Sequence, residues 1–301
     1  MKDNGLLVQY FNANTPADQT LWAKAAKDAV TLKKIGATAV WFPPATKGAA
    51  GKEDMGYAPY DLYDLGEFNQ KGSVGTRYGT KKEYLEAIDA MKVQGINVYA
   101  DIAVRQKLGA DSVEKVTAAD FNAKDIPQMI GNKKIVGALS KFTFAGRRSK
   151  YSKFKWNWNH FAGIDWQQDD FKKRVCELSG MTEEEAEKKY KLSKYDYIIG
   201  SELDLYNQEV YDELMTWAKW YEDVTGVDGF RFQEAEKVPG WFIRDFAEAA
   251  SNAGEEEKEI FTVGDFWHWR CDYINDYIAS ADNQPSMFDL SLIHISEPTR
   301  R

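Results

Sequence analysis

The chain has 301 residues, of which 44% are hydrophobic and 14% aromatic, so it can hold one large α/β domain with an insertion or two modest domains. Its 47 acidic residues outnumber 39 basic ones, and the formal net charge of −8 argues against a nucleic-acid partner and fits a neutral or small-molecule one. The sequence shows no secretory signal and no apolar run long enough to span a bilayer, which predicts a cytoplasmic protein without a membrane partner.

The first hundred residues alternate between apolar, β-rich runs and amphipathic helical stretches. The runs predict three strands, at 5–11, 37–44 and 97–104. After the first run, apolar residues recur at helical spacing until Gly36, which is typical of a helix C-cap. Thr80 then opens a second helix through a capping box with Glu83. This alternation is typical of βα units around a parallel sheet.

The alternation breaks between about 105 and 205, where a lysine- and aromatic-rich stretch is too long for a loop and predicts an inserted subdomain. Beyond it, the pattern predicts helices around 210–221 and 242–246 and strands at 227–232 and 259–266. Five units with an insertion after the third strand predict a (β/α)8 TIM-type barrel, whose active sites lie at strand C-termini. A Rossmann sheet is the alternative, but no G-x-G-x-x-G motif follows a strand. The predicted domains are a barrel at 1–104 and 206–289 and an insert at 105–205.

The only two cysteines, Cys176 and Cys271, are far apart in sequence and lie outside any C-x-x-C pattern. A zinc site requires closely spaced ligands, and a lone distant pair is weak evidence for a disulfide. We therefore expect two buried free thiols.

Five stretches carry more specific information. They are MGYAPYDLYDLGEFNQKGSVGTRYGTK (55–81), DIAVRQKLGAD (101–111), YSKFKWNWNHFAGIDW (151–166), DGFRFQEAEKV (228–238) and FTVGDFW (261–267). In this order they resemble the α-amylase family of glycoside hydrolases, especially its liquefying bacterial and cytoplasmic type. The resemblance implies a (β/α)8 barrel with a calcium-binding insertion, retaining hydrolysis of α-1,4-glucans by a nucleophile, a general acid and a third carboxylate, and an α-glucan partner such as starch.

Both catalytic positions that the resemblance identifies are substituted. The nucleophile should lie two residues after Arg231, where this chain has Gln233. A carboxamide neither attacks as a carboxylate does nor stabilises an oxocarbenium-like charge, so covalent catalysis should fail there. Glu234 is the nearest replacement, but strand alternation would send its side chain to the opposite face. The acid position carries Asp265 where the family has Glu, and a misplacement of about 1 Å can cost on the order of a hundredfold.

Asp265 has a second interpretation, as a carboxylate merely exposed at the barrel rim. Asp101 opens the third-strand motif, and the resemblance gives it a structural role rather than one in proton transfer. Gln106 stands where the family has a sugar-contacting His, and Tyr57 matches the aromatic that stacks on the sugar nearest the cleavage point. The predicted substrate-binding residues are Tyr57, Gln106, Trp267 and Lys237.

The calcium site that the resemblance implies is also substituted. Its ligand positions carry Arg105, Lys153, Glu202 and Lys237. Calcium prefers anionic oxygen ligands, so we expect no metal and no other cofactor. Either ion pairs with Glu202 or Asp204 replace the metal, or the lysines are simply solvated.

At other positions, the aromatic residues of the family are only partly present in this chain. The family's aromatic residue after the first strand is replaced by Asn12 and Ala13. Trp156 and Trp158 could stack on glucan rings, although most tryptophans of a barrel lie in its core.

The similarity ends near 289. The last twelve residues, LSLIHISEPTRR (290–301), match nothing in the family and look like a translated sequencing-library adapter. We expect this tail to be non-native and the chain to be an N-terminal barrel fragment without the third carboxylate. Two functions stay open: an α-glucan hydrolase by descent that is weak or inactive, and a non-catalytic α-glucan-binding barrel, or pseudoenzyme.

Overall fold

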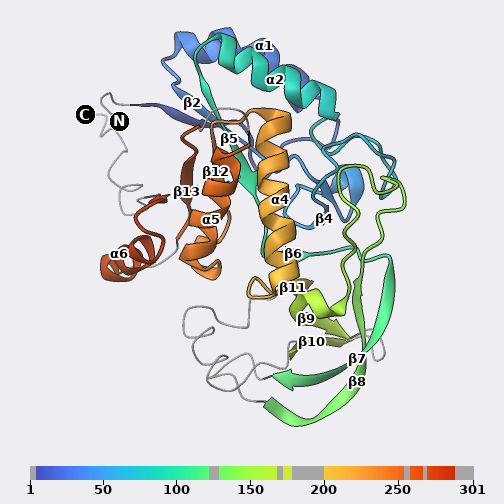
Figure 1. Cartoon of the computed structure of the whole chain (residues 1–301). Helices are drawn as coiled ribbons and strands as arrows, with labels where there is room; N and C mark the ends of the chain where they lie inside the picture. The colour runs from blue at the N-terminus through green and yellow to red at the C-terminus, as the bar shows by residue number, and fades with distance from the viewer. Residues whose placement is uncertain are drawn as a thin grey trace, which may run out of the picture.

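The computed structural model describes residues 5–121, 129–167, 172–177, 200–253, 258–266 and 270–288. Six strands form one parallel sheet in the order β1-β2-β5-β12-β13-β14 (Figure 1). They are β1 (Leu7–Gln9), β2 (Ala39–Phe42), β5 (Asn97–Ile102), β12 (Gly229–Phe232), β13 (Phe261–Gly264) and β14 (Ser286–Met287). Neighbours in the sheet follow one another in the chain, which confirms the predicted (β/α)8 type.

Helices connect these strands and cover the sheet. They are α1 (Leu21–Lys34), α2 (Lys81–Val93), α4 (Gln208–Thr225), α5 (Gly240–Ser251) and α6 (Cys271–Ser280). The buried faces of the helices and the buried strand residues form one continuous apolar core. α6 has no counterpart among the predicted helices, and only Tyr277 is buried on it. The sixth strand, β14, lies beyond the five predicted from the sequence.

Local sequence explains the first two helices. α1 buries Trp22, Ala25, Ala29 and Leu32 at the predicted spacing, and Gly36 beyond its end has φ of 90°, a left-handed conformation that glycine adopts without strain. At the start of α2, the backbone N–H of Thr80 donates to Glu83 Oε2 at 2.8 Å, while Thr80 Oγ1 accepts from the Glu83 N–H. The predicted capping box is confirmed.

Residues between β5 and α4 form a second sheet, in the order β6-β11-β9-β10-β7-β8. Its strands are β6 (Gln106–Lys107), β7 (Ser112–Phe121), β8 (Met129–Lys141), β9 (Phe161–Gln167), β10 (Lys172–Glu177) and β11 (Ser201–Leu203). A 3₁₀ helix, η2 (Trp158–His160), precedes β9. The Leu203 N–H donates to the Arg105 carbonyl at 2.7 Å, so this insert leaves the barrel and returns to it at one place. Figure 1 shows it beyond the N-terminal end of α4.

The loop after β2 is folded around a buried ammonium group. It contains η1 (Gly51–Glu53) and a small sheet of β3 (Lys47–Gly48) and β4 (Pro59–Asp61). Lys47 Nζ donates to the carbonyls of Ser73 at 2.8 Å and Val74 at 2.6 Å and lies 3.5 Å from Asp64 Oδ2. These contacts fix the loop over the C-terminal ends of the strands.

Two sequence expectations concern cysteines. Cys271 is an exposed free thiol at the start of α6, contrary to prediction. It is exposed because most of α6 lies at the surface. The side chain of Cys176, like residues 290–301, lies outside the described residues. No described helix is long and apolar enough to cross a membrane.

The capping box gives the first prediction. Thr80→Ala removes both side-chain contacts with Glu83 and should lower the free energy of unfolding by about 1 kcal/mol. Thermal unfolding of the variant measures this loss. Lys82→Ala, at a side chain of α2 that is 85% exposed, is the control and should unfold like the parent. Equal midpoints for both variants would show that the cap contributes nothing.

Candidate functional site

The carboxyl ends of β5, β12 and β13 bring three charged side chains together. Arg231 Nη1 donates to both oxygens of Asp101, at 2.9 and 3.1 Å, and its Nη2 donates to Asp265 Oδ2 at 2.7 Å. All three residues are buried. The sheet register accounts for the first contact, since Arg231 and Asp101 are direct partners on adjacent strands. Asp265 is the first residue after β13.

Asp101 accepts two further hydrogen bonds. Tyr57 donates through its hydroxyl at 2.6 Å, and Trp41 through its indole N–H at 3.1 Å. Burial and the charge of Asp101 raise the pKa of Tyr57, so the phenol stays protonated. Burial lowers the pKa of Arg231, but the carboxylates of Asp101 and Asp265 raise it by more, so its pKa lies above the ordinary value. The centre is therefore a fixed cation between two carboxylates.

Asp265 has both oxygens occupied. Oδ2 accepts from Arg231, and Oδ1 accepts from the backbone N–H of Glu234 at 2.6 Å. Hydrogen bonds from a guanidinium and a backbone amide favour the ionised carboxylate. Asp265 is thus a buried anchor for the turn after β12, and the interpretation as a residue merely exposed at the rim is wrong.

The turn after β12 departs from the strand geometry on which one prediction rested. β12 ends at Phe232, and Gln233 lies half-buried in the turn, with its N–H bonded to the Ile102 carbonyl at 3.1 Å. Glu234 has φ of 48° in the left-handed region. The alternation of side chains along β12 therefore does not extend to Glu234. The prediction that the Glu234 side chain points to the opposite face of the strand has no basis.

The Glu234 carboxylate is bound by two cations. Arg105 Nη1 donates to Oε2 at 2.9 Å, and Lys237 Nζ donates to Oε1 at 2.7 Å. Lys237 belongs to a 3₁₀ helix, η4 (Ala235–Lys237), and Arg105 follows β5. Of the two alternatives left open by the sequence, Arg105 and Lys237 form ion pairs, but their counterion is Glu234 and not Glu202 or Asp204. Sequence reasoning missed this role because Glu234 was weighed only as a nucleophile.

The residues at the calcium positions do not fit a calcium ion. Arg105 and Lys237 are cations with their own counterion, and Lys153 is exposed. Glu202 is buried, and its Oε2 has no hydrogen-bond partner among the described residues. One carboxylate does not make a calcium site, and no group of three or more acidic, His or Cys ligands occurs in the described part of the chain.

The predicted substrate-binding residues occupy different environments. Tyr57 and Gln106 are joined, because Gln106 Nε2 donates to the Tyr57 carbonyl at 3.1 Å. The Lys237 side chain is only 8% exposed and is committed to Glu234. Trp267 lies outside the described residues.

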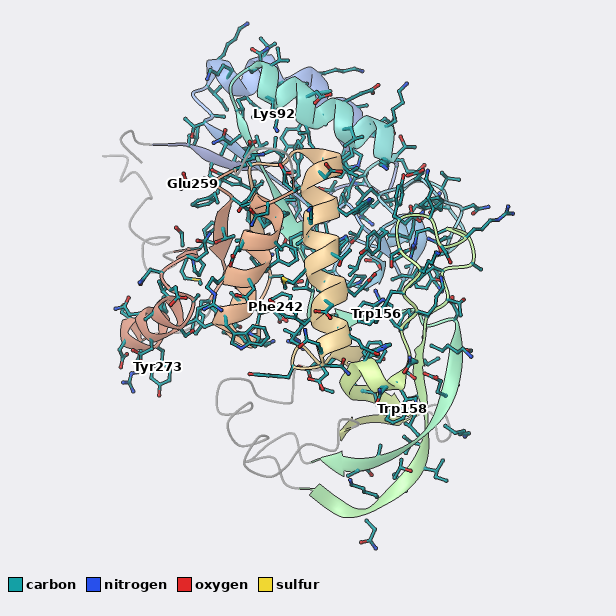
Figure 2. The ribbon with its side chains drawn as sticks, viewed as in Figure 1. Lys92, Trp156, Trp158, Phe242, Glu259 and Tyr273 are labelled. Atoms are coloured by element: carbon teal, nitrogen blue, oxygen red, sulfur yellow. The ribbon has the colours of Figure 1, made fainter. Side chains whose placement is uncertain are left out.

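The two central tryptophans of the insert differ sharply. Trp156 is buried against Phe154 and Phe161, so it belongs to the core. Trp158 is 40% exposed. Figure 2 shows both near the N-terminal end of α4, with Trp158 farther out in the insert.

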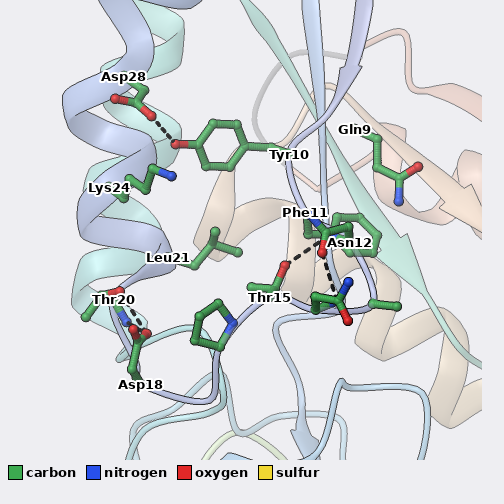
Figure 3. A pocket seen from close by; sticks show the side chains of 13 residues that line it. Gln9, Tyr10, Phe11, Asn12, Thr15, Asp18, Thr20, Leu21, Lys24 and Asp28 are labelled. Carbon is green, nitrogen blue, oxygen red and sulfur yellow. Dashed lines mark hydrogen bonds between the residues drawn. The ribbon is translucent and has the colours of Figure 1, made fainter.

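A cavity of about 800 Å³ lies between the loop after β1 and helix α1 (Figure 3). Asn12 and Ala13, where the family's aromatic residue is missing, are among its lining residues. Tyr10 donates to Asp28 Oδ2 at 2.7 Å across it, and burial together with Asp28 raises the pKa of Tyr10. The predicted site residues that the structure describes are not among the lining residues of this cavity. They are Tyr57, Gln106, Arg231, Gln233, Lys237 and Asp265. The cavity is separate from the charged centre.

Lys107 in β6 is a buried amine that sequence reasoning did not single out. It is 1% exposed, and its Nζ has no hydrogen-bond partner among the described residues. Burial lowers its pKa to about 7, an effect that Asp61 and Glu213 oppose and Arg147 reinforces. Three rings have their centroids 5.1–5.6 Å from Nζ, those of Trp156, Phe142 and Phe144.

Curated proteins similar to this chain carry the name α-amylase. The α-amylase of Geobacillus stearothermophilus is 41% identical over 291 residues, which are 96% of this chain and 52% of the relative. The cytoplasmic α-amylase of Escherichia coli (strain K12) is 35% identical over 298 residues, 96% of this chain and 59% of the relative. The chain thus spans little more than half the length of these relatives. No family model matches it.

Solved structures show the same fold. An Anoxybacillus α-amylase superposes with a TM-score of 0.56 at 16% identity, over 96% of this chain and 52% of that one. A Geobacillus thermoleovorans α-amylase complexed with acarbose gives a TM-score of 0.50 at 17% identity, over 91% of this chain and 49% of that one. Likeness at this identity supports the barrel fold alone.

Lys107 gives a pH-dependent prediction. Its pKa is about 7 in the folded state and 10.5 ordinarily, so between these values the unfolded chain binds more protons. The cost of burying the amine is therefore greatest at or below pH 7 and falls as the pH rises towards 10.5. Lys107→Met should raise the free energy of unfolding by roughly a few kcal/mol at pH 7 and by much less at pH 10.

Denaturant unfolding at both pH values measures this difference. Lys82→Met is the matched control, because that side chain is exposed and should show no pH-dependent gain. An equal gain at pH 7 and pH 10 would mean that Lys107 is destabilising for a reason other than its proton.

Proposed function

By homology over 96% of its length, the chain belongs to the α-amylase family of glycoside hydrolases, and we propose that it binds α-glucans and hydrolyses them weakly or not at all. The partner we propose is an α-1,4-glucan oligosaccharide or polysaccharide. The names of the curated relatives support this choice, and so does the acarbose complex of the Geobacillus thermoleovorans enzyme. We place the protein in the cytoplasm because the E. coli relative is named a cytoplasmic α-amylase.

The state of the nucleophile position carries the proposal. Retaining hydrolysis needs one carboxylate to attack and one carboxylic acid to protonate the leaving oxygen. Gln233, at the end of β12, has no charge with which to attack. Asp265, at the acid position, is shorter than the family's Glu and has both oxygens engaged as hydrogen-bond acceptors, from Arg231 and from the Glu234 N–H. The nucleophile position thus lacks a carboxylate, and the acid position lacks the family's Glu.

Glu234 is a poor substitute for the missing nucleophile. Its carboxylate is accessible, with 28% of the side chain exposed, but both oxygens accept hydrogen bonds from cations. Attack on a sugar would require Glu234 to give up Arg105 or Lys237. Those side chains are almost wholly buried, and an uncompensated buried charge is costly.

The same ion pairs favour the second candidate function, a non-catalytic α-glucan-binding barrel. Buried cations need a counterion. Here Glu234 neutralises Arg105 and Lys237 with hydrogen bonds of normal length. A site whose charges balance one another can fold stably without a catalytic carboxylate, which supports a binding barrel beside the damaged hydrolase.

Reversion of the two catalytic positions tests the proposal. The chain should be fused to the C-terminal half of the Geobacillus stearothermophilus α-amylase, so that the barrel has all its strands. We expect no starch hydrolysis above a blank from the unaltered fusion and measurable hydrolysis from Gln233→Asp with Asp265→Glu. Either single reversion should restore little, because catalytic residues that act as a unit are not additive.

The assay counts reducing ends and follows the anomeric configuration of the product. Turnover by the unaltered fusion that survives Glu234→Gln would refute our interpretation of β12. If the double reversion stays inactive while the unaltered fusion binds maltooligosaccharides by calorimetry, the binding barrel replaces the damaged hydrolase.

The ion pairs of Glu234 with Arg105 and Lys237 predict that folding does not depend on calcium. Millimolar calcium or a chelator should leave the melting temperature of the chain unchanged within error, with magnesium as the ionic control. Any ion that binds the folded state raises its stability by mass action. A rise with calcium that magnesium does not reproduce would contradict this expectation and would make Glu202 the first residue to test as a ligand.

A further inference from the structure

Lys47, in β3, is a buried basic residue that plays no part in the proposed chemistry. Its side chain and that of Asp64 are both 0% exposed, and Lys47 Nζ lies 3.5 Å from Asp64 Oδ2. Lysine is almost never fully buried unless its charge is compensated. The contacts of the ammonium group therefore indicate what the loop after β2 gains from it.

Backbone carbonyls of one segment surround this ammonium group. Lys47 Nζ donates to the carbonyls of Val74 at 2.6 Å, Ser73 at 2.8 Å, Phe68 at 3.2 Å and Gly75 at 3.4 Å. A lysine has three N–H donors, so all of them are used within the loop and none is left for a ligand. Without the ammonium group, the converging carbonyl oxygens would repel one another. Lys47 therefore determines how this segment is folded.

Residues just beyond the segment hold the backbone that leads to Tyr57. Arg77 Nη1 donates to the Glu53 carbonyl at 2.9 Å, and the Tyr78 hydroxyl donates to the Met55 carbonyl at 3.0 Å. Tyr78 is buried, which strengthens its hydrogen bond relative to one in water. A change in the course of the segment would reach Glu53 and Met55, and through them Tyr57.

Strand β3 holds the backbone on the other side of Tyr57. It pairs antiparallel with β4, and just beyond it the Ala49 N–H donates to the Ala58 carbonyl at 2.8 Å. Ala58 is the next residue after Tyr57, and Gln106 Nε2 donates to the Tyr57 carbonyl at 3.1 Å. The backbone of Tyr57 is thus held on one side by the strand that carries Lys47 and on the other by the segment that the Lys47 ammonium group binds.

The Tyr57 hydroxyl depends closely on this placement. It donates to Asp101 Oδ2 at 2.6 Å, and Asp101 also accepts from Arg231. Hydrogen bonds weaken steeply when their distance and angle depart from the optimum. A small displacement of the loop would detach the phenol from the charged centre, although no residue of the centre itself had changed.

We propose that Lys47 is a positioning residue for the charged centre: through the segment that its ammonium group binds, it sets the place of the Tyr57 hydroxyl on Asp101. The effect on glucan affinity rests on the proposed function, whereas the effect on Tyr57 rests on the contacts of the loop. Lys47 acts through Tyr57 and contacts no glucan itself, because its donors are used within the loop.

Fluorine NMR of the chain labelled with fluorotyrosine tests the placement of Tyr57 without any ligand, and Tyr57→Phe identifies the Tyr57 signal by its disappearance. Lys47→Met keeps a long side chain but removes its donors, so the Tyr57 signal should shift or broaden. Tyr78→Phe removes only the hydroxyl bound to Met55 and should produce the same change to a smaller extent. Lys82→Met, at an exposed side chain of α2, is the control and should leave the signal in place.

An unchanged Tyr57 signal in both Lys47→Met and Tyr78→Phe would overturn the proposal. Near-ultraviolet circular dichroism shows whether each variant is folded. If Lys47→Met does not fold, Tyr78→Phe decides, because it keeps the ring that packs against Trp22 in the core.

Maltotriose binding, measured by calorimetry well below each melting temperature, separates positioning from stability. Lys47→Met should raise the Kd of the folded chain roughly tenfold, about the effect of losing one hydrogen bond. In a Tyr57→Phe background the same substitution should add much less, since the effects of coupled residues are not additive. A lysine that only stabilises the fold would lower the melting temperature and leave the Kd unchanged, and that result would contradict the proposal.

Two further outcomes distinguish this proposal from the proposed function. If Lys47→Met weakens binding equally with and without the Tyr57 hydroxyl, Lys47 acts by another route and the proposal is wrong. If the parent binds no maltotriose while the Tyr57 signal still responds to Lys47→Met, the proposed function fails and the positioning of Tyr57 by Lys47 stands.

Discussion

The buried contact of Arg231 with Asp101 and Asp265 determines how the C-terminal ends of three neighbouring strands are arranged. The free-energy cost of removing an ion pair from water nearly cancels the attraction between its charges, so the contact adds little net stability. Its main effect is to specify the register of the strands. Only the register that places Arg231 opposite Asp101 satisfies the guanidinium, and a shift of one residue would leave buried charges without partners. The loops that follow β5, β12 and β13 all begin from this fixed arrangement.

The turn after β12 is built on the same arrangement. Gln233 follows the strand directly and donates its backbone N–H to the Ile102 carbonyl. Asp265 then takes the second arm of the guanidinium and with its other oxygen anchors the Glu234 N–H. The left-handed turn at Glu234 brings its carboxylate to Arg105 and Lys237. The position of Asp265 and the ion pairs of Glu234 with Arg105 and Lys237 therefore depend on the same turn.

Features that depend on local periodicity could be predicted from the sequence, whereas features that depend on long-range contacts could not. The parallel strands, α1 and the Thr80 cap follow from residue spacing and turn chemistry, so they were recoverable. The left-handed backbone of Glu234 was not, because a non-glycine residue adopts it only when surrounding contacts compensate the strain. Burial of Lys107 was equally hidden, since lysine in a strand is normally exposed. α6 was not among the predicted helices although its apolar residues recur at helical spacing, and only Tyr277 on it is buried.

Buried cations occur in the loop after β2, in the insert and between the two. Lys47 keeps its ammonium inside the loop after β2 by donating to backbone carbonyls, and Arg147 of the insert pairs with Asp61 at 2.8 Å. Lys107 lies among aromatic rings without a hydrogen-bond partner in the described part of the chain, so it is buried most easily as a neutral amine. Burial lowers the pKa of both Lys47 and Lys107, so the free energy of unfolding that these two groups contribute depends on pH, whereas Arg147 links the insert to the barrel through its hydrogen bond to Asp61.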